Sequence, residues 1–272
     1  MFCAAPTVLI GLTSAPVEQR AKTSWQVNVF TAGAPPAAAT IQIVEGELGW
    51  SLTHVFGLTE TSPFIAICEP RPEHRDLSAA ESAALKACQG VELVSSGELR
   101  VVDEGGHEVA HDGATLGEIT VRGNVVMKGY YNDAEATAAA IKNGWFHSGD
   151  AAVVHPNGYV EIRDRFKDVI ISGGENVSSI EVEGCLLTHT AVQEVAVVGM
   201  PHEKWGESPH AFVVVQAGLE VSEDELKSHV RENLAHFKTP QWVSFVEELP
   251  KTATGKVQKF MLRDGQSGIS RQ

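Results

Sequence analysis

The hydrophobic pattern of this 272-residue chain changes twice, and these two changes limit the folds that it can adopt. Up to about Pro70, short apolar runs alternate with helical stretches, and from about Val91 to Arg165 short strands alternate with turns. After Lys167, strands alternate with amphipathic helices. The order predicts an α/β piece, then antiparallel β structure, then an α+β domain. We therefore expect two domains, residues 1–166 and 167–272, the first divided into a βαβ piece (1–70) and a β subdomain (91–166).

Three consecutive stretches in the first part predict a βαβ unit. WQVNVFTAG (25–33) predicts a strand that ends in a glycine turn, and PPAAATIQIVEGEL (35–48) predicts a helix that begins with proline. WSLTHVFG (50–57) predicts the next strand, which makes a parallel sheet the expected arrangement. The loop GLTETS (57–62) follows the carboxyl end of that strand, where open α/β sheets bind ligands.

The middle part is expected to form an antiparallel, barrel-like subdomain. Its strands are predicted in GELRVVDEGG (97–106), GEITVRG (117–123) and AAVVHPNGYVEIRDR (151–165), the last containing the hairpin signal Asn157-Gly158. One helix is predicted in AEATAAAI (134–141), capped by Asn132 or Asp133 and stopped by Asn143-Gly144. The third part is expected to contain strands at VIISGG (169–174), VQEVAVVGM (192–200), HAFVVVQ (210–216) and WVSFVEEL (242–249), with helices in 178–189 and 222–234.

The net charge indicates which partners the chain can bind, and the cysteines indicate the cellular compartment. A formal net charge of −14 is opposite to the basic footprint of general nucleic-acid or anionic-membrane binders, so we expect no nucleic-acid partner. The cysteines (Cys3, Cys68, Cys88 and Cys185) form no CxxC pair and are expected to be reduced thiols of a cytoplasmic protein. The apolar start lacks a basic segment and is too short to span a bilayer. The final SRQ does not support a peroxisomal address.

Two acidic motifs are candidates for nucleotide chemistry. In GLTET, Thr59 and Glu60 place a hydroxyl and a carboxylate together, which are oxygen ligands that suit Mg²⁺ and a phosphate. The alternative is a solvated loop. In GWFHSGD, Asp150 closes a Ser-Gly turn and is placed to accept hydrogen bonds from a diol such as ribose. The alternative is an aspartate that bonds its own turn, which is the more common role.

Three further stretches contain cations or glycines that admit a functional or a structural reading. RDRFKD (163–168) is either a ligand-facing segment at the domain boundary or a charged linker. SGGEN (172–176) either brings backbone N–H groups close to a ligand or forms an ordinary β-turn. LPKTATGKVQK (249–259) places Lys256 after a Thr-Gly turn, either as a delivered charge or as a surface lysine.

Read in order, the motifs of this chain closely resemble those of the adenylate-forming enzymes, and within them the fatty acyl-CoA synthetase branch. The motifs are GAPP, HVFGLTET, GEITVRGNVVMKGYY, WFHSGD, GYVEIRDRFKDVIISGGENVSSIEVE, WGE and LPKTATGKVQK, and the resemblance extends from residue 1 to Asp264. It implies a ligase that uses ATP and Mg²⁺ to convert a carboxylic acid to an acyl-adenylate. CoA then displaces AMP and forms the thioester. The expected partners are thus the acid, ATP and CoA.

The resemblance also implies roles for individual residues. Gly33, Ala34, Pro35 and Phe56 would wall the adenine, and Gly57 would also belong to the nucleotide site. Phe56 stands where the family usually has tyrosine. Thr59 would contact phosphate and Glu60 would hold Mg²⁺. Asp150 would bind the ribose hydroxyls with help from Arg165.

The remaining roles fall in the last third of the chain. Lys167 would be the hinge about which the small domain rotates between the two half-reactions. Gly173 and Gly174 would line the pantetheine tunnel. Lys256 would stabilise the charge that develops at the α-phosphate during adenylation, which requires a cation positioned in the transition state.

One family motif is not found. A phosphate loop resembling YTSGTTGxPKG does not occur in the sequence, so we expect the chain to correspond to the C-terminal half of such an enzyme. Two readings remain open. The chain is an acyl-CoA synthetase whose other motifs suffice, or it is a non-catalytic adenylate- or CoA-binding half. In the second reading, a separate polypeptide would supply the first half. A homo-oligomer is a further possible state of the chain.

Overall fold

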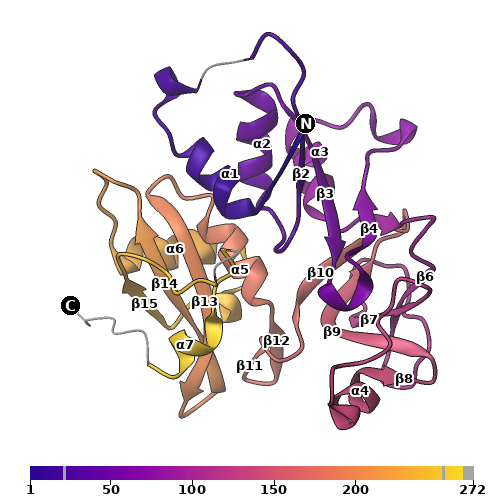
Figure 1. Ribbon diagram of the computed structural model, residues 1–272. Helices are drawn as coiled ribbons and strands as arrows, with labels where there is room; N and C mark the ends of the chain where they lie inside the picture. The colour runs from indigo at the N-terminus through magenta and orange to yellow at the C-terminus, as the bar shows by residue number, and fades with distance from the viewer. Residues whose placement is uncertain (21–22, 253–254, 266–272) are drawn as a thin grey trace. The chain divides into compact units, whose positions relative to one another are not determined.

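A computed structural model describes residues 1–20, 23–252 and 255–265 of the chain (Figure 1). The chain contains two compact units, Met1–Arg165 and Phe166–Gln272. The structure has the mixed architecture that the hydrophobic pattern predicts, with a partly parallel sheet, an antiparallel sheet and an α+β unit.

The first unit begins with a five-stranded sheet in the order β1-β2-β3-β4-β5. Its strands are β1 (Phe2–Ala4), β2 (Asn28–Thr31), β3 (Ser51–Gly57), β4 (Phe64–Cys68) and β5 (Val91–Glu92). The first three strands are parallel, and β4 and β5 join in antiparallel register. The connection from β2 to β3 contains α2 (Ala38–Gly46), which confirms the predicted βαβ unit.

Three helices pack with this sheet, namely α1 (Pro6–Thr13), α2 and α3 (Ala79–Ala87). Buried Leu9, Val29, Ile41 and Leu52 form their shared core, in which apolar side chains of helices and strands leave water together. α3 was not expected from the pattern. Its N-cap is Ser78, whose hydroxyl accepts from the Glu81 N–H in a capping box.

The second sheet of this unit is antiparallel, with the order β10-β9-β7-β6 and β8 paired to β9. Its strands are β6 (Glu98–Val102), β7 (Gly117–Arg122), β8 (Ile141–Lys142), β9 (Trp145–Val154) and β10 (Val160–Arg165). The hairpin expected at Asn157-Gly158 joins β9 to β10. The Gly158 N–H donates to the His155 carbonyl at 2.8 Å, and Gly158 takes the left-handed conformation with φ of 80°.

The expected helix of this part is α4 (Ala134–Ala140), and Asp133 caps it by accepting from the Ala136 N–H at 2.9 Å. The prediction for its end is wrong. The helix stops at Ala140, and Asn143 and Gly144, with φ of 53° and 81°, instead form the two-residue turn between β8 and β9. An Asn-Gly pair favours a type I′ hairpin because both residues tolerate positive φ.

The second unit has one sheet in the order β12-β11-β14-β13, and β15 pairs in parallel with β14. Its elements are β11 (Ile170–Ser172), β12 (Glu175–Val177), α5 (Ser179–Leu186), β13 (Val192–His202), β14 (Gly206–Val215), α6 (Glu223–Asn233), β15 (Trp242–Phe245) and α7 (Lys259–Arg263). Ser178 and Ser222 cap α5 and α6.

Alternate residues of β13 enter two different cores, which accounts for its continuous apolar run. Val195 and Val197 pack with α5 and α6, whereas Ala196 and Val198 pack with Leu262 of α7. Successive side chains of a strand point to opposite faces, so helices cover both faces of this strand. The short helix α7 was not expected from the sequence.

Candidate functional site

The carboxyl ends of β2 and β3 lie at one edge of the parallel part of the sheet, where Thr31 pairs in register with His54. The loop with Gly33, Ala34 and Pro35 follows β2, and Phe56 and Gly57 end β3. Gly33 takes φ of 95°, a conformation that glycine adopts without strain. Parallel neighbours thus place the two predicted adenine-binding segments at the edge where α/β sheets bind ligands.

A tight turn after β3 positions Thr59 and Glu60. A Cβ atom on Gly57 would lie 1.7 Å from the carbonyl oxygen of Pro63, so only glycine permits this close backbone approach. The 3₁₀ turn Thr59–Thr61 is held by the buried Thr61 hydroxyl, which accepts from the Leu58 N–H at 2.9 Å. The turn presents an exposed Thr59 and a half-buried Glu60.

Glu60 is held from two sides by the segment that follows β7. Its backbone carbonyl accepts from the Met127 N–H at 2.8 Å, and its Oε1 accepts from the Tyr130 hydroxyl at 3.0 Å. Burial, followed by the hydrogen bond to Glu60, raises the pKa of Tyr130. Tyr130 was not singled out from the sequence, although it belongs to the quoted motif GEITVRGNVVMKGYY.

Asp150 and Arg165 lie opposite each other on β9 and β10. The Arg165 Nε donates to the Asp150 Oδ1 at 3.0 Å, and the Asp150 side chain is only 7% exposed. Asp150 lies inside β9 rather than closing a turn, so its position differs from the Asx-turn alternative. A buried carboxylate beside a partly exposed guanidinium is suited to accept hydrogen bonds from hydroxyl groups.

Glu118 on β7 orders the backbone immediately before Asp150. Its Oε1 accepts from the Gly149 N–H at 3.0 Å, and its Oε2 lies 2.6 Å from His147 Nδ1. Gly149 takes φ of 74° within the strand. Neither Glu118 nor His147 was predicted as a site residue. Both belong to quoted motifs, but their contact depends on the pairing of β7 with β9.

Lys167 lies in the turn between β10 and β11, two residues after the first unit ends. Gly173 and Gly174, with φ of 62° and 90°, connect β11 to β12. The Gly173 N–H donates to the Trp205 carbonyl at 2.9 Å, and a Cβ on Gly173 would lie 2.9 Å from the indole ring. The glycine turn thus packs against the loop between β13 and β14.

Lys256 is an exposed residue at the end of a hydrogen-bonded turn, of which Ala253 and Thr254 lie outside the described residues. Lys251 and Val257 form an antiparallel bridge, and the Thr252 N–H donates to the Lys256 carbonyl at 2.8 Å. The Lys256 N–H donates to the Thr252 hydroxyl at 3.1 Å. At the base of the turn, Lys251 Nζ lies 2.6 Å from the Glu194 carboxylate.

The predicted site residues divide between the two units. Gly33, Ala34, Pro35, Phe56, Gly57, Thr59, Glu60, Asp150 and Arg165 belong to the first unit. Lys167, Gly173, Gly174 and Lys256 belong to the second. Cys3, Cys68, Cys88 and Cys185 are all free, as the sequence predicts. Across the described ranges, every helix is too short or too polar to cross a membrane.

Two family descriptions match this chain. "AMP-binding enzyme" matches residues 1–131, and "AMP-binding enzyme C-terminal domain" matches residues 181–256. Together they include most of the predicted site residues.

The chain is similar to curated CoA ligases over nearly its whole length. It is 48% identical to 2-methylpropanoate–CoA ligase CCL4 of Humulus lupulus, over 98% of this chain and 48% of the relative. It is 45% identical to the peroxisomal trans-cinnamate:CoA ligase of Petunia hybrida, over 97% of this chain and 46% of the relative. The chain therefore spans about half the length of the curated relatives it matches.

The fold is also similar to solved structures of a CoA ligase and an amide bond synthetase. The anthranilate CoA ligase AuaEII in complex with anthranoyl-AMP is 29% identical, with a TM-score of 0.85 over 97% of this chain and 49% of that chain. The amide bond synthetase McbA from Marinactinospora thermotolerans is 31% identical, with a TM-score of 0.84 over 97% of this chain and 52% of that chain.

Proposed function

This chain belongs to the adenylate-forming superfamily of AMP-binding enzymes, and we propose that it performs carboxylic acid–CoA ligation with ATP and CoA as co-substrates. Residues 1–166 would correspond to the C-terminal part of the large AMP-binding domain, and residues 167–272 to the small C-terminal domain. The observation that carries the proposal is the buried Asp150 carboxylate beside Arg165, within a chain whose relatives are named as CoA ligases.

In the first proposed step, a carboxylate oxygen of the acid attacks the α-phosphorus of ATP. The bond to the bridging oxygen breaks, and pyrophosphate leaves. Gly33, Ala34, Pro35, Phe56 and Gly57 would contact the adenine, because they share the carboxyl edge of β2 and β3. An aromatic ring such as Phe56 retains stacking without the phenol.

The remaining groups of the first step are polar. Asp150 would accept from the ribose hydroxyls, with Arg165 fixing its carboxylate. Thr59 would contact phosphate, and Glu60 would supply one carboxylate oxygen to Mg²⁺, an ion that typically combines one or two protein carboxylates with substrate phosphates. The Glu60 carboxylate on its ordered turn is a donor suited to that ion. Lys256 would offset the charge that develops around the α-phosphate.

In the second proposed step, the CoA sulfur attacks the acyl carbon of the adenylate. The bond to the AMP oxygen breaks, AMP leaves, and the thiol proton is lost. Lys167 would act as the hinge between the steps, which its place in the turn between the two units supports. Gly173 and Gly174 would leave room for the pantetheine arm, since neither carries a side chain.

We propose a carboxylic acid as the substrate and assign no chain length. A cytoplasmic location is proposed from the free cysteines, although some relatives are named as peroxisomal.

A second candidate function is an adenylate- or CoA-binding half that performs no chemistry alone. The observation in its favour is that the chain spans about half the length of its relatives. Catalysis would then require a polypeptide that provides the phosphate-binding loop.

One sample of the purified chain distinguishes the candidates. Pyrophosphate release with mixed carboxylic acids, ATP and Mg²⁺ is measured beside calorimetric titration with AMP, CoA and a non-hydrolysable acyl-adenylate analogue. Turnover supports the ligase. Binding of the adenylate analogue without turnover supports the half-site. If neither turnover nor binding is detected with folded protein, both candidates are wrong for this chain.

A further inference from the structure

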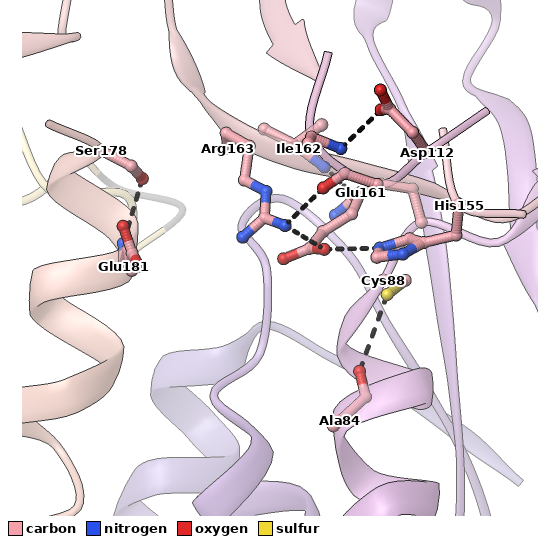
Figure 2. A network of polar contacts seen from close by, with 12 residues as sticks. Ala84, Cys88, Asp112, His155, Glu161, Ile162, Arg163, Ser178 and Glu181 are labelled. Carbon is pink, nitrogen blue, oxygen red and sulfur yellow. Dashed lines mark hydrogen bonds and ion pairs between the residues drawn. The ribbon is translucent and has the colours of Figure 1, made fainter. Parts of the chain in front are cut away.

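Three side chains with metal-binding atoms converge at the junction of α3 with the β9–β10 hairpin (Figure 2). Cys88 directly follows α3, His155 directly follows β9, and Glu161 lies on β10. Their ligand atoms all lie within 4.8 Å of one another. None of the three is among the residues that the proposed ligase chemistry uses.

Backbone hydrogen bonds hold Cys88 beside Glu161. The Gln89 N–H donates to the Val160 carbonyl at 2.9 Å, and the Val160 N–H donates to the Gly90 carbonyl at 2.8 Å. The Cys88 carbonyl is also in contact with His54 Nδ1, at 2.8 Å. The segments that carry Cys88 and Glu161 are therefore joined by backbone hydrogen bonds, which hold the two side chains in place before any ion binds.

His155 is oriented toward Glu161. Its Nε2 lies 2.7 Å from the Glu161 Oε2, and its backbone N–H donates to the Tyr159 carbonyl at 2.8 Å. On the other side of the imidazole, a Cβ on Gly113 would lie 2.9 Å from Nδ1, so the ring packs closely against that glycine. The Arg163 Nη2 lies 3.1 Å from the same Glu161 oxygen and helps to fix the carboxylate.

We propose that Cys88, His155 and Glu161 form a binding site for a zinc-class divalent ion, with water as the fourth ligand. A sulfur, an imidazole nitrogen and a carboxylate oxygen are the three donor types that Zn²⁺ accepts, at about 2.0–2.3 Å in tetrahedral geometry. The thiol and imidazole also select against Mg²⁺, which prefers oxygen ligands. The site thus differs in chemistry from the oxygen donor at Glu60.

Binding of the metal ion requires the Cys88 thiol to give up its proton. The thiol loses this proton to solvent when the ion binds, because the ion takes a thiolate, a neutral imidazole nitrogen and a carboxylate as its ligands. Burial raises the pKa of the Cys88 thiol to about 12. The nearby Arg163 charge opposes the cation, and we therefore expect weaker binding than at an all-cysteine site.

The first experiment titrates the metal-free chain with Co²⁺ alone and then with Zn²⁺. A thiolate-to-cobalt charge-transfer band in the near ultraviolet should appear and disappear when Zn²⁺ is added. The band should be absent from Cys88→Ser, and Zn²⁺ affinity measured by calorimetry should fall at least about tenfold in Cys88→Ser, His155→Gln and Glu161→Gln. Two other cysteine variants serve as controls, Cys3→Ser at an exposed position and Cys185→Ser at a half-buried one. Both should bind Zn²⁺ with the affinity of the wild type.

Thermal unfolding provides a readout that does not depend on spectroscopy. Since the ion would bind the folded chain, Zn²⁺ should raise the wild-type melting temperature and leave that of Cys88→Ser nearly unchanged. The proposal is overturned if wild type gives no cobalt–thiolate band, or if the band and the affinity survive in folded Cys88→Ser. Neither result would bear on the ligase proposal, whose residues are different.

Discussion

The Arg165 guanidinium contacts the Asp150 carboxylate at 3.0 Å across two neighbouring antiparallel strands. The hairpin at residues 155–158 starts the pairing of the two strands, and a register shift between Ile162 and Asp164 then brings Arg165 opposite Asp150. The Asp150 side chain is buried and that of Arg165 is one-third exposed, so the pair combines a buried carboxylate with a guanidinium that reaches the surface. This geometry fixes the Asp150 carboxylate as an acceptor for a hydroxyl-bearing ligand.

Asp150→Asn should weaken binding of AMP or an acyl-adenylate analogue by roughly tenfold or more, because hydrogen bonds to a charged group contribute about 1.5–3 kcal/mol. Calorimetry with AMP and with its 2′,3′-dideoxy analogue checks the cause. Wild type should discriminate strongly between the two, and the variant only weakly. Equal discrimination in both proteins would show that Asp150 does not read the ribose.

Lys256→Ala should reduce acyl-adenylate formation by about 10²–10³ in an active enzyme that carries this sequence, because a cation positioned for the transition state is lost. Thioester formation from supplied acyl-AMP should be nearly unchanged. The two half-reactions are measured separately, with Lys251→Ala as a lysine control at the base of the same turn. Equal losses in both steps would argue against the adenylation role.

Lys167→Pro should affect the two half-reactions in the opposite way to Lys256→Ala. Proline fixes φ and removes a backbone N–H, so rotation about this turn would be restricted. Adenylation should persist and thioester formation should fall, as followed by AMP release from preformed adenylate. Lys167→Ala, which leaves the backbone free, is the matched control. If Lys167→Pro supports normal thioester formation, the hinge lies elsewhere.

Two buried threonines offer a matched test of stability. In the portion of the chain described, the Thr31 hydroxyl has no hydrogen-bond partner, whereas the Thr61 hydroxyl bonds Leu58. Thr31→Val should raise the free energy of unfolding by about 1 kcal/mol, and Thr61→Val should lower it by about 1–3 kcal/mol. Urea unfolding measures both. A loss of stability in Thr31→Val comparable to that in Thr61→Val would contradict the assignment.

Stability should fall as pH drops below 6.5, because burial lowers the pKa of His54 to about 4. The unfolded chain binds a proton at higher pH than the folded chain does, so protonation favours unfolding across this window. The loss between pH 7 and pH 5 amounts to roughly 2 kcal/mol. Unfolding in metal-free buffer should show a shallower pH dependence for His54→Asn. An identical slope in both proteins would exclude His54 as the cause.

Local pattern was enough to predict most of the elements. The βαβ order, the hairpin at Asn157-Gly158 and the helix capped by Asp133 follow from periodicity and turn chemistry, which involve residues close in sequence. The capping box at Ser78 and Glu81 is an equally local signal for the start of α3. The role of Asn143-Gly144 was misassigned, because an Asn-Gly pair suits both a helix end and a hairpin.

The order of the motifs, and with it the family, can be read from the sequence, because each motif is a run of neighbouring residues. The contacts between distant residues follow instead from the three-dimensional fold. Glu60 contacts Tyr130, and Asp150 contacts Arg165. Cys88, His155 and Glu161 gather at one junction. These pairings depend on strand register and on close packing between elements, and a shift of one residue would turn each side chain to the opposite face of its sheet.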